Sequence, residues 1–168
     1  KIFKKWSPAI FLGWSNIGFD DEMLRKEFFK GIRYPYITNT APNKRHDGIN
    51  IARAAYAIDQ SVLKTEINEK NNAVFKLESI ARMQGFDSSD AHSALADAEM
   101  TAKVLNIVRK KQKHIWGAFL KTANKSDTET IIKKGEIITL NEYYYGRSRL
   151  HLVVPLHPKH CMHPIYQG

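Results

Sequence analysis

Short apolar runs alternate with polar segments along the chain, and they predict strands and helices in mixed order. The apolar run over residues 9–14 predicts a buried strand, and the turn-prone stretch 15–18 follows it. Residues 19–31 begin with acidic side chains, continue with basic ones and close on Gly31, which is the charge order that a helix dipole favours. The pattern therefore predicts a strand, a turn and a helix at the start of the chain.

The next eighty residues favour helices joined by polar connections. The expected elements are a loop over 34–44, a helix from Asp47 to Ile58, a surface connection over 59–73, a short helix over 75–86 and a long helix from about Ser93 to Lys111. Gly85 is expected to stop the short helix, and three basic residues in the last turn of the long helix suit its dipole.

The residue pattern changes from helix-like to strand-like after Gln112. Residues 131–132, 136–140 and 150–154 are β-like runs separated by turn residues. We therefore expect an α/β domain over 1–112, a linker over 113–125 and part of a small β domain over 126–168. The last part holds too few strands for an independent sheet.

Composition limits the class of protein. The chain has 168 residues and one cysteine, Cys161, which excludes an internal disulfide framework and fits a reducing compartment. No apolar run approaches the roughly 20 residues that a membrane-spanning helix needs. The segment 1–6 does not resemble a signal peptide, and it lacks an initiator methionine. We expect a cytoplasmic protein whose chain begins inside a longer polypeptide.

Charge is distributed unevenly along the chain. Residues 1–100 carry 14 Lys and Arg against 13 Asp and Glu, whereas residues 101–168 carry 12 against 4. A basic second part beside a nearly neutral first part indicates a polyanionic partner, with nucleic acid ahead of a membrane surface. The alternative is a solvated basic face.

Two short motifs carry candidate chemistry. Residues 16–20 (NIGFD) lie at the predicted strand-to-helix junction, and His92 and Asp97 lie at the start of the long helix. Positions five apart are separated by about 140° around a helix, so these two side chains converge only if His92 precedes the helix. Carboxylates suit Mg²⁺, two such ions can activate water and stabilise a leaving oxygen, and a histidine can take the proton of the water. The alternative is that Asp20 is a helix N-terminal acid, Asp97 a solvated residue and His92 a capping residue.

Together these motifs resemble the DnaQ-like 3′→5′ exonucleases, and among them the bacterial exonuclease I family. The resemblance covers about residues 9–112 and rests on 12–22, 45–47, 53–57, 75–78 and 91–97. Residues 153–158 are more weakly similar to the small β-barrel that follows the nuclease domain in that family. The resemblance implies an RNase H-like exonuclease domain, incomplete at its N-terminus, followed by the start of a small β-barrel.

The resemblance also implies roles for individual residues. Asp20 would bind metal through water, Asp97 would bind metal directly, and His92 would be the general base beside two Mg²⁺ ions. The implied partners are single-stranded DNA and single-stranded DNA-binding protein, the implied product is mononucleotides, the implied context is DNA repair, and the chain would be a monomer. The residues implied to touch DNA are Asn16, Arg25, Tyr36, Arg53 and Lys76.

One departure from the family pattern changes the expected activity. The first motif of the family, Asp-X-Glu on the opening strand, has no counterpart among the 19 residues before Asp20. We therefore expect this chain to bind metal poorly and to have little activity by itself.

Two further clusters contain reactive or stacking side chains. Residues 143–149 interleave tyrosines with arginines, so Tyr144 and Arg147 are candidates for stacking on bases and for contacting phosphates. A hairpin with packed tyrosines is the alternative. The His and Cys residues over 157–163 do not have the spacing of a closed zinc site, and we interpret them as loop residues.

Two other functions remain open at this point. One is a non-catalytic nucleic-acid-binding module that has lost its first acidic motif. The other is a DnaQ-like exonuclease that acts on RNA or proofreads for a polymerase. The likeness to a β-barrel after residue 112 favours the exonuclease I family.

Overall fold

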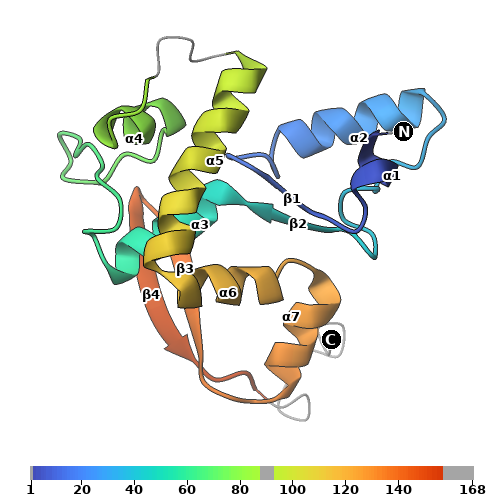
Figure 1. The fold of residues 1–168 in the computed structure, drawn as a ribbon. Coiled ribbons are helices and arrows are strands. Elements are labelled where there is room, and N and C mark those ends of the chain that lie inside the picture. Colours follow the sequence, from blue (N-terminus) through green and yellow to red (C-terminus); the bar gives the residue numbers. More distant parts are fainter. Residues whose placement is uncertain (1, 88–92, 157–168) are drawn as a thin grey trace.

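The computed structural model describes residues 2–87 and 93–156, and Figure 1 shows their arrangement. In chain order the elements are α1 (Ile2–Trp6), β1 (Ile10–Gly13), α2 (Asp20–Lys30), β2 (Lys44–Asp47), α3 (Gly48–Ile58), α4 (Leu77–Met83), α5 (Ala94–Lys111), α6 (Lys113–Lys121), α7 (Lys125–Lys133), β3 (Ile138–Tyr144) and β4 (Arg147–Val153). The long helix α5 crosses the middle of the molecule, and α1 and α2 lie together at one side of it (Figure 1).

The strand predicted from the apolar run is β1, and it pairs in parallel with β2, with Gly13 opposite Asp47. The sequence predicted only a loop up to residue 44, because β2 has the polar sequence Lys-Arg-His-Asp and lacks apolar alternation. Its side chains instead find individual partners. Arg45 pairs with Asp21 at 3.2 Å, and the His46 ring packs edge-on against a phenylalanine ring at 4.7 Å.

The hydrophobic core lies between α3, α4 and α5. These helices follow the sequence prediction closely, because each places apolar residues at helical spacing on one face. Gln112, just past α5, is buried, and its Nε2 donates to the backbone oxygen of Ala55 at 3.2 Å. The largest fully buried side chains are Ile51, Val62, Leu63, Ile80, Val104 and Val108.

Asp47 joins the end of β1 to the start of α3. Its Oδ1 accepts hydrogen bonds from the backbone N–H of Ser15 at 2.8 Å and of Ile49 at 3.1 Å, so it caps α3 and fixes the turn after β1. The backbone approaches closely here. A Cβ on Gly48 would lie 2.7 Å from the carbonyl oxygen of Gly13, which explains why glycine opens α3.

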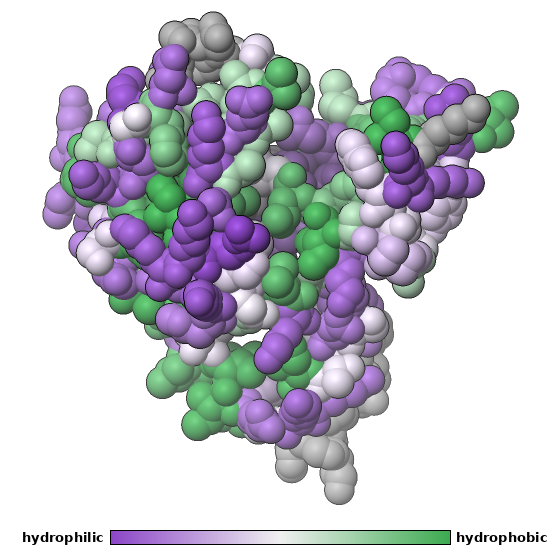
Figure 2. Space-filling view, in the orientation of Figure 1, coloured by the Kyte–Doolittle hydropathy of each residue, from purple (hydrophilic) through white to green (hydrophobic). Residues whose placement is uncertain are grey.

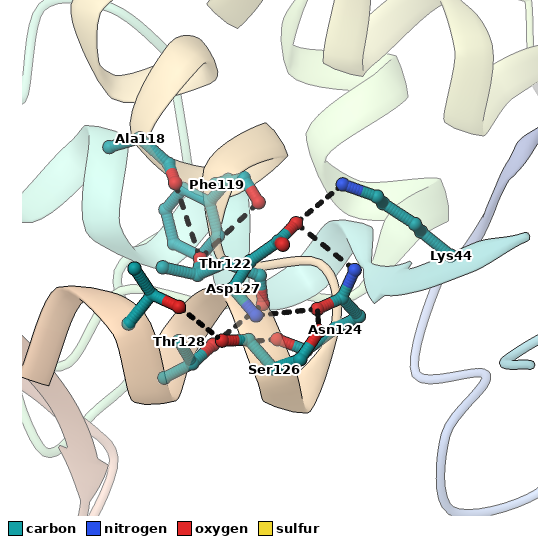
Figure 3. A network of polar contacts seen from close by, with 9 residues as sticks. Lys44, Ala118, Phe119, Thr122, Asn124, Ser126, Asp127 and Thr128 are labelled. Atoms are coloured by element: carbon teal, nitrogen blue, oxygen red, sulfur yellow. Dashed lines mark hydrogen bonds and ion pairs between the residues drawn. The ribbon is translucent and has the colours of Figure 1, made fainter. Parts of the chain in front are cut away.

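The segment expected as a linker, 113–125, instead forms α6 and the first residue of α7. Residues 131–132, predicted to be β-like, lie within α7, so that prediction is wrong. Local side-chain bonds explain this helix. The Asn124 side chain caps it by accepting from the Asp127 N–H at 2.7 Å, and the Asp127 carboxylate binds Lys44 of β2 (Figure 3). These contacts fix α7 to the strand pair.

β3 and β4 overlap the β-like runs predicted over 136–140 and 150–154 and form an antiparallel hairpin, which the sequence left as one of two alternatives, with Tyr144 opposite Arg147. Its two-residue turn, Tyr145 and Gly146, has positive φ at both positions, the geometry that suits the twist of a hairpin. The hairpin packs against α3. The residues that the structure describes contain no closed barrel, and no helix among them is long and apolar enough to cross a membrane.

We predict that Asp47→Ala lowers the free energy of unfolding by about 1–3 kcal/mol, because a helix cap and a second backbone bond are lost together. Asp47→Asn keeps an acceptor oxygen and should lose less. Urea unfolding of the three proteins measures the difference. Equal stability of the Ala and Asn variants would contradict this role.

We predict that His46 makes the stability depend on pH. Burial is the main cause that lowers the pKa of His46 below its ordinary value of 6.5, so the folded protein holds a neutral ring while the unfolded chain takes up a proton. Stability should therefore fall as pH drops below about 6.5, by at most about 1.4 kcal/mol per pH unit from this residue. Unfolding of the wild type and of His46→Asn at pH 7.5 and 5.5 tests this, and an identical pH dependence in both would refute it.

Candidate functional site

A cleft of about 1560 Å³ collects four of the ten predicted site residues. The end of β1, the start of α2, helix α3, the segment before α4, the first turns of α5 and strand β3 line it. The charged or aromatic side chains in its lining that concern the site are Asp20, Arg53, Phe75, Lys76, Asp97 and Tyr143. Acidic, basic and aromatic groups therefore face one space.

Asp20 and Asp97 reach this cleft from different helices. Asp20 is the first residue of α2 and is exposed. Asp97 lies in the first turn of α5, whose N-cap is Ser93, with its hydroxyl accepting from the N–H of Ala96 at 3.2 Å. The structure thus brings together two of the three predicted catalytic residues. The third, His92, lies outside the described residues.

Asn16, predicted to touch DNA, lies under the start of α2 rather than at an open surface. It is buried, and its Nδ2 donates to the Asp21 carboxylate at 3.0 Å, which also pairs with Arg45 at 3.2 Å. Burial raises the pKa of Asp21, and Arg45 and the Asn16 bond oppose that rise. The sequence analysis did not single out Asp21. These contacts fix the position at which α2 begins, and therefore the position of Asp20.

Arg25 and Tyr36 lie together beside α2, outside the lining of the cleft. The Arg25 guanidinium lies 5.6 Å from the centre of the Tyr36 ring and also pairs with Glu22. Tyr34 contacts Tyr36 edge-on at 6.0 Å. A basic side chain and exposed aromatic rings therefore form a second small group outside the cleft, of the kind found on single-strand binding surfaces.

Arg53 is the most unusual of the predicted contacts, because aromatic rings surround it. Its Cζ lies 3.6 Å from the centre of the Tyr143 ring and 5.9 Å from that of Phe75. Burial lowers the pKa of Arg53, although the group remains a cation. Lys76 follows Phe75 and is exposed, and the Trp14 Nε1 donates to the Phe75 carbonyl at 3.1 Å.

The structure places the two residues predicted in the hairpin away from the cleft. Tyr144 packs against Tyr145 at 4.1 Å, and the Arg147 Nε donates to Asn72 at 2.8 Å. The side chain that reaches the cleft is the neighbouring Tyr143, which the sequence analysis did not select. The alternation of side chains along β3 could have identified Tyr143, because only every second side chain of a strand can face the core.

A second, shallower groove of about 530 Å³ lies between α5, β1 and α6. Its lining includes Leu12, Leu105 and Trp116. Figure 2 shows hydrophobic side chains gathered in a hollow at the centre of this face, between the part that carries α5 and the part that carries α2. This groove holds none of the predicted site residues.

The carboxylates of the cleft suit part of a divalent metal site. Mg²⁺ is commonly held by one or two carboxylates together with water and substrate phosphates, and Asp20 and Asp97 provide that number of carboxylates. Over residues 2–87 and 93–156, no three His, Cys, Asp or Glu side chains cluster closely enough to hold an ion without further ligands.

Comparison with solved structures identifies the fold as the α/β fold of exonucleases. The chain is similar to E. coli exonuclease I in complex with a dT13 oligonucleotide, with a TM-score of 0.78 and 23% identity over 94% of this chain and 36% of that one. It is also similar to an ExoI/SSB-Ct complex (TM-score 0.73, 23% identity, 94% and 36% covered). A zinc-bound E. coli ExoI–ssDNA complex is a third similar structure (TM-score 0.74, 22% identity, 89% and 34% covered).

Comparison of the sequence with curated proteins is more informative about the family, because the similar proteins are named exodeoxyribonuclease I. The chain is 29% identical over 150 residues to the protein of Buchnera aphidicola subsp. Schizaphis graminum and 30% identical over 127 residues to that of subsp. Acyrthosiphon pisum. These matches cover 86% and 75% of this chain, but the chain spans only 31% of each relative. No model of a known protein family matches the sequence. The resemblance to bacterial exonuclease I is thus confirmed.

Proposed function

We propose that this chain is part of a nuclease that removes nucleotides from the 3′ end of single-stranded DNA by metal-assisted hydrolysis. The observation that carries the proposal is the cleft shared by Asp20 and Asp97 with Arg53 and Lys76. Carboxylates provide oxygen ligands for a divalent cation, and the basic side chains neutralise phosphates. Relatives that are named exodeoxyribonuclease I support this chemistry.

The proposed roles follow the positions of the residues. Asp97 holds the cation directly, and Asp20 holds it through water. A bound Mg²⁺ would polarise the phosphodiester and lower the pKa of the attacking water. Arg53 and Lys76 orient the strand, and His92 is the proposed proton acceptor. Stacking of a base farther from the 3′ end on the ring pair beside Arg25 would help to hold the strand in register.

The domain organisation is part of the same proposal. Residues 1–112 form the larger part of an RNase H-like exonuclease domain that lacks its Asp-X-Glu strand, and the β3–β4 hairpin begins a small β domain. Single-stranded DNA-binding protein is the proposed protein partner, since a similar structure is an ExoI/SSB-Ct complex. Mg²⁺ is the proposed cation, and the zinc-bound relative makes Zn²⁺ a necessary comparison.

A non-catalytic nucleic-acid-binding module is the second candidate. The observation that favours it is the small set of metal ligands among the described residues. The formal net charge of +9 fits either candidate, because both bind polyanions.

We predict that activity depends on both carboxylates once the missing motif is provided. The chain extended at its N-terminus with the opening Asp-X-Glu segment of E. coli exodeoxyribonuclease I should release mononucleotides from a 5′-labelled dT oligomer when Mg²⁺ is added. Loss of a group behind a metal ligand costs about 10–100-fold, so Asp97→Asn or Asp20→Asn should reduce the rate at least about 100-fold. Gel analysis of the labelled products measures the rate.

Glu129→Gln is the matched control for this assay, since Glu129 lies on α7 and pairs with Lys125 away from the cleft. Full activity of the Asp97→Asn variant would refute the metal role. An extended chain that binds DNA but never cleaves it, with either Mg²⁺ or Zn²⁺, would favour the non-catalytic module.

We predict that binding of single-stranded DNA falls steeply with salt. Each phosphate that is neutralised on a single strand adds about 0.7 to the slope of log affinity against log salt. Lys76→Ala should therefore lower the slope by about 0.7, whereas Lys125→Ala on α7 should leave it unchanged. Fluorescence anisotropy of a labelled dT oligomer between 50 and 300 mM NaCl provides the slopes. A flat salt response of the wild type would contradict phosphate-driven binding.

A further inference from the structure

Arg53 lines the cleft, and its charge is held differently from that of three arginines elsewhere that form ion pairs. Arg25 pairs with Glu22, Arg45 with Asp21, and Arg82 with Glu66. Arg53 forms no ion pair with any residue that the structure describes, and its Nη1 donates to the Asn50 side chain at 3.5 Å. Asp47 favours the charge of Arg53 without forming an ion pair with it, and burial disfavours that charge, so an anion that enters the cleft would gain a direct partner.

Two aromatic rings hold this guanidinium instead of a carboxylate. The Tyr143 ring lies 3.6 Å from Cζ, and Phe75 meets Tyr143 edge-on at 6.0 Å, with an interplanar angle of 86°. The Nε of Arg53 is sealed from solvent and has no hydrogen-bond partner. A planar guanidinium stacks well on an aromatic face, and this contact leaves the two Nη nitrogens of Arg53 as the ones that can bind phosphate oxygens.

The ring that holds Arg53 comes from a distant part of the chain. Arg53 lies on α3, whereas Tyr143 lies on β3, and Tyr143 alternates with Asn141 on the side of the hairpin that faces α3. Because a strand alternates its side chains, Tyr144 points to the other face. The hairpin therefore contributes one side chain to the cleft, and that side chain touches Arg53.

We propose that Tyr143 is a positioning residue, which holds the Arg53 guanidinium over its ring so that Arg53 presents its Nη nitrogens to a backbone phosphate of a nucleic-acid strand in the cleft. This inference rests on the proposed function for the identity of the anion. In this proposal the β3–β4 hairpin contributes to nucleic-acid binding through Arg53, without itself contacting the nucleic acid.

A double-mutant cycle tests the coupling between the two side chains. The probe is a 5′-fluorescein-labelled 12-nucleotide dT oligomer, with EDTA present so that no strand is cut. Tyr143→Leu should weaken binding about fivefold to tenfold, and Tyr143→Phe, which keeps the ring face, should restore affinity to within about twofold of the wild type. In an Arg53→Ala background, Tyr143→Leu should cause no further loss.

Tyr56→Leu is the matched control for lost aromatic packing. Tyr56 meets Phe75 edge-on at 5.7 Å but is not part of the cleft. This variant should keep wild-type affinity. Equal losses for Tyr143→Leu with and without Arg53 would overturn the proposal, as would a Tyr143→Phe variant that binds as poorly as Tyr143→Leu.

A measurement without DNA separates this proposal from the proposed function. The Nε–Hε NMR signal of Arg53 should be shifted upfield by the Tyr143 ring, keep that shift in Tyr143→Phe and lose it in Tyr143→Leu. An unshifted signal in the wild type would overturn the positioning role even if DNA binds. A shifted signal in a protein that does not bind the oligomer would overturn the proposed function and leave the ring contact standing.

Discussion

The carboxylate of Asp47 is the constraint on which the arrangement of the cleft depends. It accepts from Ser15 and Ile49, so the turn that leaves β1 and the first turn of α3 are held by one side chain. The parallel pairing of Gly13 with Asp47 and the close approach of Gly48 to the Gly13 carbonyl permit this geometry. Because Asp20 follows the turn and Arg53 follows the cap, the spacing between an acidic and a basic wall of the cleft is set at this junction.

The site therefore contains two kinds of residue: polar side chains that bind one another beneath it, and charged side chains that face the cleft. Asn16 and Arg45 both bind the Asp21 carboxylate under the start of α2, which holds that junction in place. Asp20 and Arg53 face the cleft, and Arg53 forms no ion pair within the part of the chain that the structure describes. If stability were the only requirement, a charge such as that of Arg53 would be paired or fully exposed. A half-buried charge without an ion pair, next to a well-held junction, indicates a site that binds a charged ligand.

The sequence predicted the elements whose signal is local, and it missed those that depend on distant partners. The β1 run, the acidic start of α2 and the long apolar stripe of α5 are visible in the letters alone. β2 is polar and forms a strand only because β1 pairs with it, and α7 replaces the expected β-like run because Asn124 caps it and Lys44 holds it. In the site, the order of the motifs predicted that Asp20 and Asp97 share a cleft. The choice of Tyr143 over Tyr144 depends on which face of β3 is turned toward the cleft, and that face is known only once the packing of the hairpin is known.

The part of the described chain after residue 112 contacts the part before it at several points, and their positions bear on the role of its basic charge. They include the bond from Lys44 of β2 to Asp127 of α7 and the packing of Tyr143 against Arg53 and Phe75. A segment held at both ends of its path cannot swing as an independent module without breaking one contact. Its excess of Lys and Arg therefore adds to the positive potential around the cleft, even where none of those side chains lines the cleft.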